Sequence, residues 1–309
     1  MISADSIRRI TEGWGKRIAV QRQAEAERAS APAQKGEGPR VSRITAIAPI
    51  AGQANISTDG AMVLIRGEGW KEAKLVAISE VQVQPAEARV DLRGGESRRS
   101  QDLLVTLHTH SYQAGVWDAD TMAVYQYAEG LRRGLTKGQR LSSVNDGAPW
   151  IERITLTNFP QAVQIVDWSH ASGRLWAVAN AVLGDQTPEA KQWASGQLDR
   201  LWQGGVAEVV AALGGLNLDQ DRYADLVRQA PGYFESNQAR MAYDYFRAEG
   251  YPIGSGTVES GANTVVHGRM RRPGRGWQRD NGQAMLAGLS ELHSGRFERA
   301  WQDTLPLAA

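Results

Sequence analysis

The segment ANISTDGAMVLIRGEGWKEAKLVAISEVQVQ, residues 54–84, decides the fold. It contains two runs rich in β-branched and apolar residues, 54–67 and 70–84, which are separated by a Gly-Glu-Gly turn. Two such runs around a glycine-containing turn are typical of a β-hairpin. A third run, DLLVTLHTHSYQ at 102–113, follows on the C-terminal side. The sequence therefore predicts three consecutive β-strands.

Downstream of these strands, the pattern alternates between helix and strand. Residues 118–136 place apolar side chains at three- and four-residue spacing after two aspartates that can cap a helix. A short strand is expected at 141–146, a helix at 148–158 and a further strand at 162–168. This order predicts an α/β protein with a mixed sheet flanked by helices, and it is the order that an RNase H-like domain uses.

The remaining segments complete the predicted organisation. Residues 4–29 have helical periodicity, the Pro/Gly-containing residues 31–42 are typical of a linker, and a later helix is expected over about 235–249. No strand pattern returns in the region between the sheet and the last helices, so we expect an all-helical insertion there. The predicted parts are an N-terminal helix and linker (1–42), the first part of an RNase H-like core (43–170), the helical insertion (171–250) and the last part of the core with a basic tail (251–309).

Composition excludes several classes of protein. The chain has 309 residues, enough for a large domain with an insertion. It has no cysteine, which excludes a disulfide scaffold and a thiolate zinc site, and its five histidines are too scattered for a zinc cluster. No apolar run resembles a signal peptide or a membrane span, so we expect a cytoplasmic protein with no membrane partner. The net charge of +1 permits nucleic-acid binding without requiring it.

Three acidic residues fall where they can share one site. Asp59 lies in the first predicted strand, Asp146 at the end of the fourth, and Glu259 in the first turn of a late helix. Neighbouring central strands would bring the two aspartates together, and the helix would carry the glutamate to them. Such a trio can hold two metal ions that activate a water and stabilise a leaving 3′ oxygen. Ligands that are all oxygen suit Mg²⁺ or Mn²⁺ rather than zinc.

Each acid also has a purely structural interpretation. Asp-Gly, which occurs at Asp59 and Asp146, is a strong turn signal, and a carboxylate in the first turn of a helix stabilises the helix dipole. The motif Asp167-Trp-Ser-His170 follows the fifth predicted strand, where the aspartate can cap the next helix and the histidine can form a core hydrogen bond. The residues alone leave both interpretations open.

Five blocks of the chain, in order, resemble DDE transposases of the Kra-type bacterial insertion-sequence family, which are related to Mutator-like transposases. The resemblance implies an RNase H-like, metal-dependent enzyme that cuts DNA at the ends of a mobile element and joins the freed strand to target DNA. It also implies two Mg²⁺ or Mn²⁺ ions, a homo-oligomer on DNA and association with the nucleoid. The blocks, which extend over about residues 43–302, are STDGAMVLIRGEGWKEAKL, DGAPWI, FPQAVQIVDWSHA, YPIGSGTVESGANTVVHGRM and GWQRDNGQAMLAGLSELHSGRFERAW.

The resemblance assigns roles to matching positions. It implies that Asp59, Asp146 and Glu259 are the catalytic, metal-binding acids. Asp167 and His170 resemble the C/D-x-x-H signature of related transposases, a pair that positions groups near the active site. An alternative assignment makes Asp167 the second metal ligand. We prefer Asp146, because its block ends the fourth strand and the D-x-x-H block comes one strand later.

A basic segment near the C-terminal end is the predicted DNA contact. It contains five arginines and no acid between positions 269 and 279. Arginine pairs with phosphates, and a tryptophan can stack on an unpaired base. The predicted DNA-binding residues are Arg269, Arg271, Arg272, Arg275 and Trp277.

Two departures from the family pattern keep other interpretations open. Only residues 1–42 precede the predicted core, without an evident helix-turn-helix, and the late block reads RRPGRGW where relatives tend to have a GMRW-like ending. One alternative is an N-terminally truncated remnant, with residues 1–42 left from a DNA-binding region, that binds DNA or full-length transposase as a regulator without cutting. Another is an RNase H-like nuclease with no role in transposition.

Overall fold

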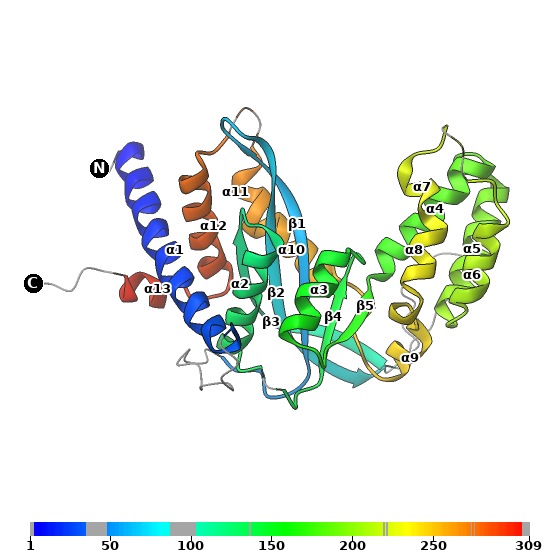
Figure 1. The fold of residues 1–309 in the computed structure, drawn as a ribbon, viewed down its shortest axis with the longest axis horizontal. Coiled ribbons are helices and arrows are strands. Elements are labelled where there is room, and N and C mark those ends of the chain that lie inside the picture. Colours follow the sequence, from blue (N-terminus) through cyan, green and yellow to red (C-terminus); the bar gives the residue numbers. More distant parts are fainter. Residues whose placement is uncertain are drawn as a thin grey trace, which may run out of the picture.

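A five-stranded mixed sheet in the order β3-β2-β1-β4-β5 forms the centre of the computed structural model (Figure 1). β1 pairs with β2 in antiparallel and with β4 in parallel orientation, and β4 pairs with β5 in parallel orientation. The predicted α/β class with a mixed sheet is confirmed, and the arrangement is compatible with an RNase H-like fold. The structure describes residues 3–34, 48–86, 103–135, 137–218, 220, 222–272, 274 and 276–304. The strands are β1 (Ala54–Ile65), β2 (Gly69–Pro85), β3 (Leu103–Gly115), β4 (Leu141–Asn145) and β5 (Val163–Val166).

The hairpin of β1 and β2 forms where the sequence predicts it. Gly67 in its turn and Gly69 at the start of β2 have φ angles of 79° and 78°, a backbone region that residues with a Cβ rarely adopt. Along β1, successive side chains point to opposite faces of the sheet. Val63 and Ile65 are fully buried on one face, and Ile56 is buried on the other. Both faces of this central strand are therefore covered.

Helices cover each face of the sheet (Figure 1). On one face, Met122 of α2 shares a buried cluster with Ile56. On the other face, Val265 of the π-helix η2 and Leu286 of α12 share a buried cluster with Val63. The first face is covered by α2 (Ala119–Arg132) and α3 (Pro149–Asn158), and the second by α10 (Gly256–Gly261), η2 (Ala262–His267), α11 (Gly268–Met270) and α12 (Arg279–His293).

The first helix packs against the last ones. α1 (Ala4–Gln34) buries Trp14 and Ile18 in a cluster with Ala287 and with Ala300 of α13 (Phe297–Asp303). α1 is longer than predicted and continues into the expected linker, and positions 35–42 of that linker lie outside the described residues. Within the described part of the chain, no helix combines the length and apolarity that crossing a membrane requires.

The helices between β5 and α10 form a second lobe beside the β5 edge of the sheet (Figure 1). Their core, which includes Phe234 and Tyr243, is continuous with Val144 and Val166 of the sheet. The single helix predicted over 235–249 is wrong, because the chain breaks after α8, where the side chain of Asn237 donates a hydrogen bond to a backbone carbonyl one turn earlier. The lobe consists of α4 (Trp168–Leu183), α5 (Pro188–Trp202), α6 (Val206–Gly214), α7 (Asp225–Arg228), α8 (Ala230–Ser236), η1 (Gln238–Arg240) and α9 (Tyr243–Ala248).

A closed ring of three arginines and three glutamates joins α1, α2 and α12. Each arginine lies between two glutamates, and each glutamate between two arginines, with ion-pair distances from 2.5 to 3.0 Å. Five of the six side chains are at most 8% exposed. Because every buried charge has two opposite neighbours, the ring avoids the large cost of an unpaired buried ion. In order around the ring, its members are Arg22, Glu291, Arg296, Glu129, Arg132 and Glu25.

Breaking this ring should destabilise the protein strongly. We expect Glu129→Gln to lower the free energy of unfolding by about 3–5 kcal/mol, because Arg132 and Arg296 lose their shared buried carboxylate. Urea denaturation measures the change. Asp225→Asn, which removes an exposed ion pair with Arg228, is the matched control and should cost about 0–1 kcal/mol. Equal small effects of the two substitutions would contradict the importance of the ring.

The ring also predicts how stability depends on pH. Burial alone would raise the pKa of Glu129, but the charges of Arg296 and Arg132 overcome it and lower this pKa from 4.5 to about 2. A carboxylate whose folded-state pKa is lowered contributes stability above its unfolded-state pKa and loses it as the pH falls. The free energy of unfolding of the wild type should therefore fall between pH 4.5 and about 2, and Glu129→Gln should show a smaller decrease in the same titration. Parallel curves for the two proteins would be the contrary result.

Candidate active site

Two of the predicted site residues, Asp146 and Asp167, lie at the same edge of the sheet. β4 and β5 run parallel to β1, so their carboxyl ends lie at the same edge. Asp146 directly follows β4, and Asp167 directly follows β5. The backbone N–H of Thr58 donates a 2.6 Å hydrogen bond to Oδ1 of Asn145, which ties the middle of β1 to the end of β4. The neighbouring Asp59 is therefore held on the strand next to Asp146.

Asp59 lies within β1 rather than in the turn that Asp-Gly often forms. Its Oδ1 accepts a 2.7 Å hydrogen bond from the N–H of Gly60, and its side chain is half-buried. Burial raises the pKa of Asp59, and the charges of Asp146 and Glu259 raise it further, against the lowering effects of the Gly60 N–H and of His170. These four ionisable groups therefore share one electrostatic environment.

Asp146 lies in a tight turn after β4. Its Oδ1 accepts a 2.9 Å hydrogen bond from the N–H of Ala148, and Gly147 has a φ angle of 91°. The hydroxyl of Tyr233 on α8 donates a 2.9 Å hydrogen bond to the carbonyl of Asp146. The second lobe therefore holds the backbone of this acid directly.

Asp167 is buried and its carboxylate is occupied by hydrogen bonds. Its Oδ1 accepts from the N–H of His170 at 2.9 Å and from the hydroxyl of Ser169 at 2.5 Å, and its Oδ2 accepts from the N–H of Ser255. Burial alone would raise the pKa of Asp167, but the hydrogen bonds from His170, Ser169 and Ser255 hold it far below its ordinary value. Asp167 thus caps α4, as its structural interpretation predicted, and also fixes the loop before α10.

His170 and Glu259 lie on either side of this carboxylate. Nδ1 of His170 is 3.3 Å from Oδ1 of Asp167, and this contact raises the pKa of His170. The hydroxyl of Ser255 is 3.3 Å from Oε1 of Glu259. Glu259 lies in the first turn of α10 as predicted, and it is exposed. One buried aspartate therefore orients both the histidine and the segment that carries the glutamate.

Ligand atoms of Asp167, His170 and Glu259 lie within 4.8 Å of one another. Asp59 and Asp146 are outside this tight group, although their charges act on it. Among the described residues, the tight group therefore shares only Glu259 with the predicted metal-binding acids.

The donor set fits a divalent cation. Among the described residues, Asp59 has no ion-pair partner within 4.0 Å, although it is half-buried and the charges of two other carboxylates act on it. A cation held between these oxygens would remove that repulsion. Oxygen donors on Asp59, Asp146 and Glu259 match the preference of Mg²⁺ or Mn²⁺. Asp167 would be a poorer ligand, because hydrogen bonds already occupy both of its oxygens.

The basic segment lies at the hairpin of β1 and β2. Arg269, Arg271 and Arg272 are exposed, and Arg275 lies outside the described residues. Trp277 is only partly exposed, because its ring packs against the sheet core, its Nε1 donates to the carbonyl of Met270 at 3.1 Å and its backbone pairs with β1. Trp277 therefore anchors the segment, and stacking of its ring on a base stays a prediction.

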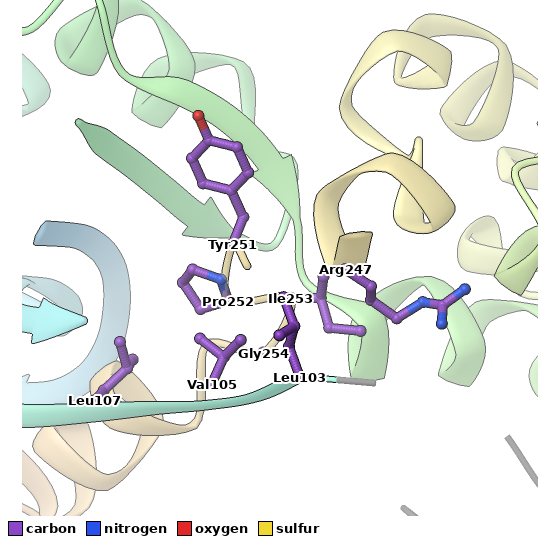
Figure 2. A pocket seen from close by; sticks show the side chains of 8 residues that line it. All are labelled: Leu103, Val105, Leu107, Arg247, Tyr251, Pro252, Ile253 and Gly254. Atoms are coloured by element: carbon purple, nitrogen blue, oxygen red, sulfur yellow. The ribbon is translucent and has the colours of Figure 1, made fainter. Parts of the chain in front are cut away.

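A separate hollow of about 180 Å³ does not match the chemistry of this site. In Figure 2, side chains of β3 line one side of it, and the segment that leads to α10 lines the other. Its lining is mostly apolar and includes a single charged residue, Arg247. The hollow holds no group of acids.

Isosteric substitutions should separate the two kinds of aspartate. We expect Asp167→Asn to lower the free energy of unfolding by about 1–3 kcal/mol, because the amide cannot accept all the hydrogen bonds of the buried carboxylate. Asp59→Asn should leave the free energy of unfolding unchanged or raise it, because it removes a half-buried charge that faces other acids. Urea denaturation at pH 7 without divalent ions measures both. Comparable losses in the two variants would mean that Asp59 also has a structural role.

Comparison with known proteins does not identify the chain. No protein-family model matches it, and no curated protein matches it. The case for a function therefore depends on the geometry of the site and on the sequence blocks.

Proposed function

We propose that this chain is the catalytic part of a DDE-type DNA transposase with an RNase H-like core. The observation that supports the proposal most is that the charges of Asp146 and Glu259 both act on the half-buried Asp59. Asp59 lies in β1, Asp146 follows β4, and Glu259 lies in α10. A structural role alone does not account for a half-buried carboxylate whose pKa is raised by two other acids, because repulsion between like charges disfavours the folded state.

The fold supports the proposal at a coarser level. Three antiparallel strands are followed by two parallel ones, and the helical lobe lies between β5 and the helix that carries Glu259. In the proposed assignment, this lobe is an insertion in an RNase H-like core. In the sequence, the lobe separates Asp59 and Asp146 from Glu259. In this assignment, α10 is the element that adds the last acid to the core.

The side chains of the site have distinct proposed roles. Asp59, Asp146 and Glu259 would hold the metal. When bound, two Mg²⁺ or Mn²⁺ ions would supply activation of the attacking hydroxyl and stabilisation of the leaving 3′ oxygen. Asp167 orients the Ser255 loop, and with it the helix of Glu259, through its hydrogen bond from the Ser255 N–H. His170 presents a ring held by Asp167 toward the same acids.

The substrate of the proposed reaction is DNA, cut by hydrolysis and then joined by transfer. Water attacks a phosphodiester at the end of the element, the P–O bond to the leaving strand breaks, and a 3′-OH is freed. That 3′-OH attacks a phosphodiester of target DNA, and one P–O bond forms as another breaks. Exposed Arg269, Arg271 and Arg272 would neutralise backbone charge near the hairpin, and a homo-oligomer would hold paired ends.

Cleavage of DNA that carries the flanking element ends tests the proposal. We expect the wild type to cut in Mg²⁺ or Mn²⁺ and Asp59→Asn, Asp146→Asn and Glu259→Gln to lose at least about 10²-fold in rate, because each removes a charged ligand. The control Asp225→Asn alters an exposed acid in the second lobe and should cut normally. Retained cleavage in any of the three variants would remove that residue from the assigned triad.

The same assay distinguishes the alternative interpretations. Asp167→Asn should retain residual cleavage after correction for its folded fraction, whereas complete loss in folded protein would support Asp167 as a metal ligand. A wild type that binds DNA but never cuts would favour the non-catalytic regulator. Cutting without strand transfer would favour a nuclease with no role in transposition.

A further inference from the structure

The second lobe places the side chain of Tyr233, here called the platform, next to Asp146. The ring of Tyr233 lies against the turn after β4, since a Cβ built on Gly147 would be 3.2 Å from Cε2 of that ring. The Tyr233 hydroxyl also donates to the carbonyl of Asp146 at 2.9 Å. Burial raises the pKa of Tyr233 to about 12, so its hydroxyl stays a neutral donor. The platform is therefore fixed to the backbone of a proposed metal ligand.

An arginine lies on this platform. Arg174 follows His170 by one turn of α4, so both side chains project from the same face of the helix. The Arg174 guanidinium is 3.9 Å from the centre of the Tyr233 ring, and its Nη1 donates to the carbonyl of Leu226 at 3.1 Å. Stacking and this hydrogen bond fix the plane of the guanidinium.

Arg174 is half-buried, yet no carboxylate pairs with it. Among the residues that the structure describes, none places a carboxylate oxygen within 4.0 Å of its guanidinium. Asp146 is the carboxylate whose charge acts on Arg174. Its partners are a neutral carbonyl and an aromatic ring, so its positive charge is not neutralised by a carboxylate. In the ring around Glu129, by contrast, each arginine pairs with two carboxylates.

We propose that Arg174, stacked on Tyr233, binds a non-bridging oxygen of a DNA phosphate next to the bond that is cut. This inference rests on the proposed function. A phosphodiester anion must approach a group of carboxylates that repel it, and a cation fixed beside them offsets that repulsion. Arginine suits this task because its planar N–H groups bind phosphate in two places at once. The helical lobe then forms one wall of the active site.

Neutral phosphate analogues locate the contact. DNA duplexes that carry a single methylphosphonate at successive positions around the cut site are bound in Ca²⁺, and affinity is measured by fluorescence anisotropy. For the wild type, one position should weaken binding roughly tenfold, the usual worth of one charge-assisted hydrogen bond. Arg174→Met should weaken binding to ordinary DNA by a similar factor and be insensitive to the analogue at that position. Arg222→Met, which alters another arginine stacked on a tyrosine in the same lobe, is the matched control.

The outcomes separate this inference from the proposed function. If Arg174→Met keeps full sensitivity at every position, or binds ordinary DNA as the wild type does, the contact is not made by Arg174. Absence of DNA binding by the folded wild type would also overturn the inference. Binding with the expected pattern but without cleavage in Mg²⁺ would support the contact and contradict the proposed catalysis.

Tyr233→Phe tests the platform itself. It keeps the ring under Arg174 and removes the hydroxyl that donates to the Asp146 carbonyl. We expect unchanged DNA affinity and a cleavage rate reduced roughly tenfold, as for loss of one positioning hydrogen bond. A loss of affinity with an unchanged rate would contradict the assigned division between Tyr233 and Arg174.

Discussion

The buried ring of six charges around Glu129 is the interaction on which the rest of the structure depends. It fixes α1 and α2 to α12 by paired guanidinium and carboxylate groups, and Gln113 of β3 donates to Glu129 at 3.2 Å. The ring thereby sets the position of α12 against the edge strand. The hydroxyl of Ser290 on α12 and that of Ser294, the C-cap of this helix, then accept hydrogen bonds from backbone N–H groups of β3. An edge that could pair with another chain is covered in this way, and the helix layer that includes α10 is held over β1.

The ring and the sheet edge differ in how their carboxylates are balanced by opposite charges. In the ring, each carboxylate has two guanidinium neighbours, and the pKa of Glu129 is lowered to about 2. At the edge, Asp59 faces two other acids, and its pKa is raised. Negative charge is therefore neutralised by arginines in the ring, whereas several negative charges act on Asp59 at the sheet edge. Such an imbalance costs stability, and it is typical of a site built to bind a cation or an anionic substrate.

Local sequence patterns predicted the helices and strands. They could not predict the contacts between residues that are distant in the sequence. The hairpin, the strand order and the first-turn position of Glu259 follow from alternation, glycine turns and helix-start signals. The ring could not be predicted, because Arg22 and Glu291 are 269 positions apart and each is an ordinary surface residue in its own helix pattern. Likewise, nothing in the local sequence marks Tyr233 as a neighbour of Asp146. Arg174 had a signal, its spacing of four from His170, but its partners come from another helix.

Asp167 does more than cap the first turn of α4. Its carboxylate begins α4, holds the ring of His170 and binds the N–H of Ser255 before α10. α4 leads into the second lobe and carries Arg174, whereas α10 carries Glu259. A single buried group thus fixes the angle at which the lobe leaves the sheet and the point at which the last acid returns to it. Because both depend on one carboxylate, the second lobe and α10 cannot shift independently. In the proposed enzyme, this constraint would hold the metal-binding acids at a fixed separation before a substrate binds.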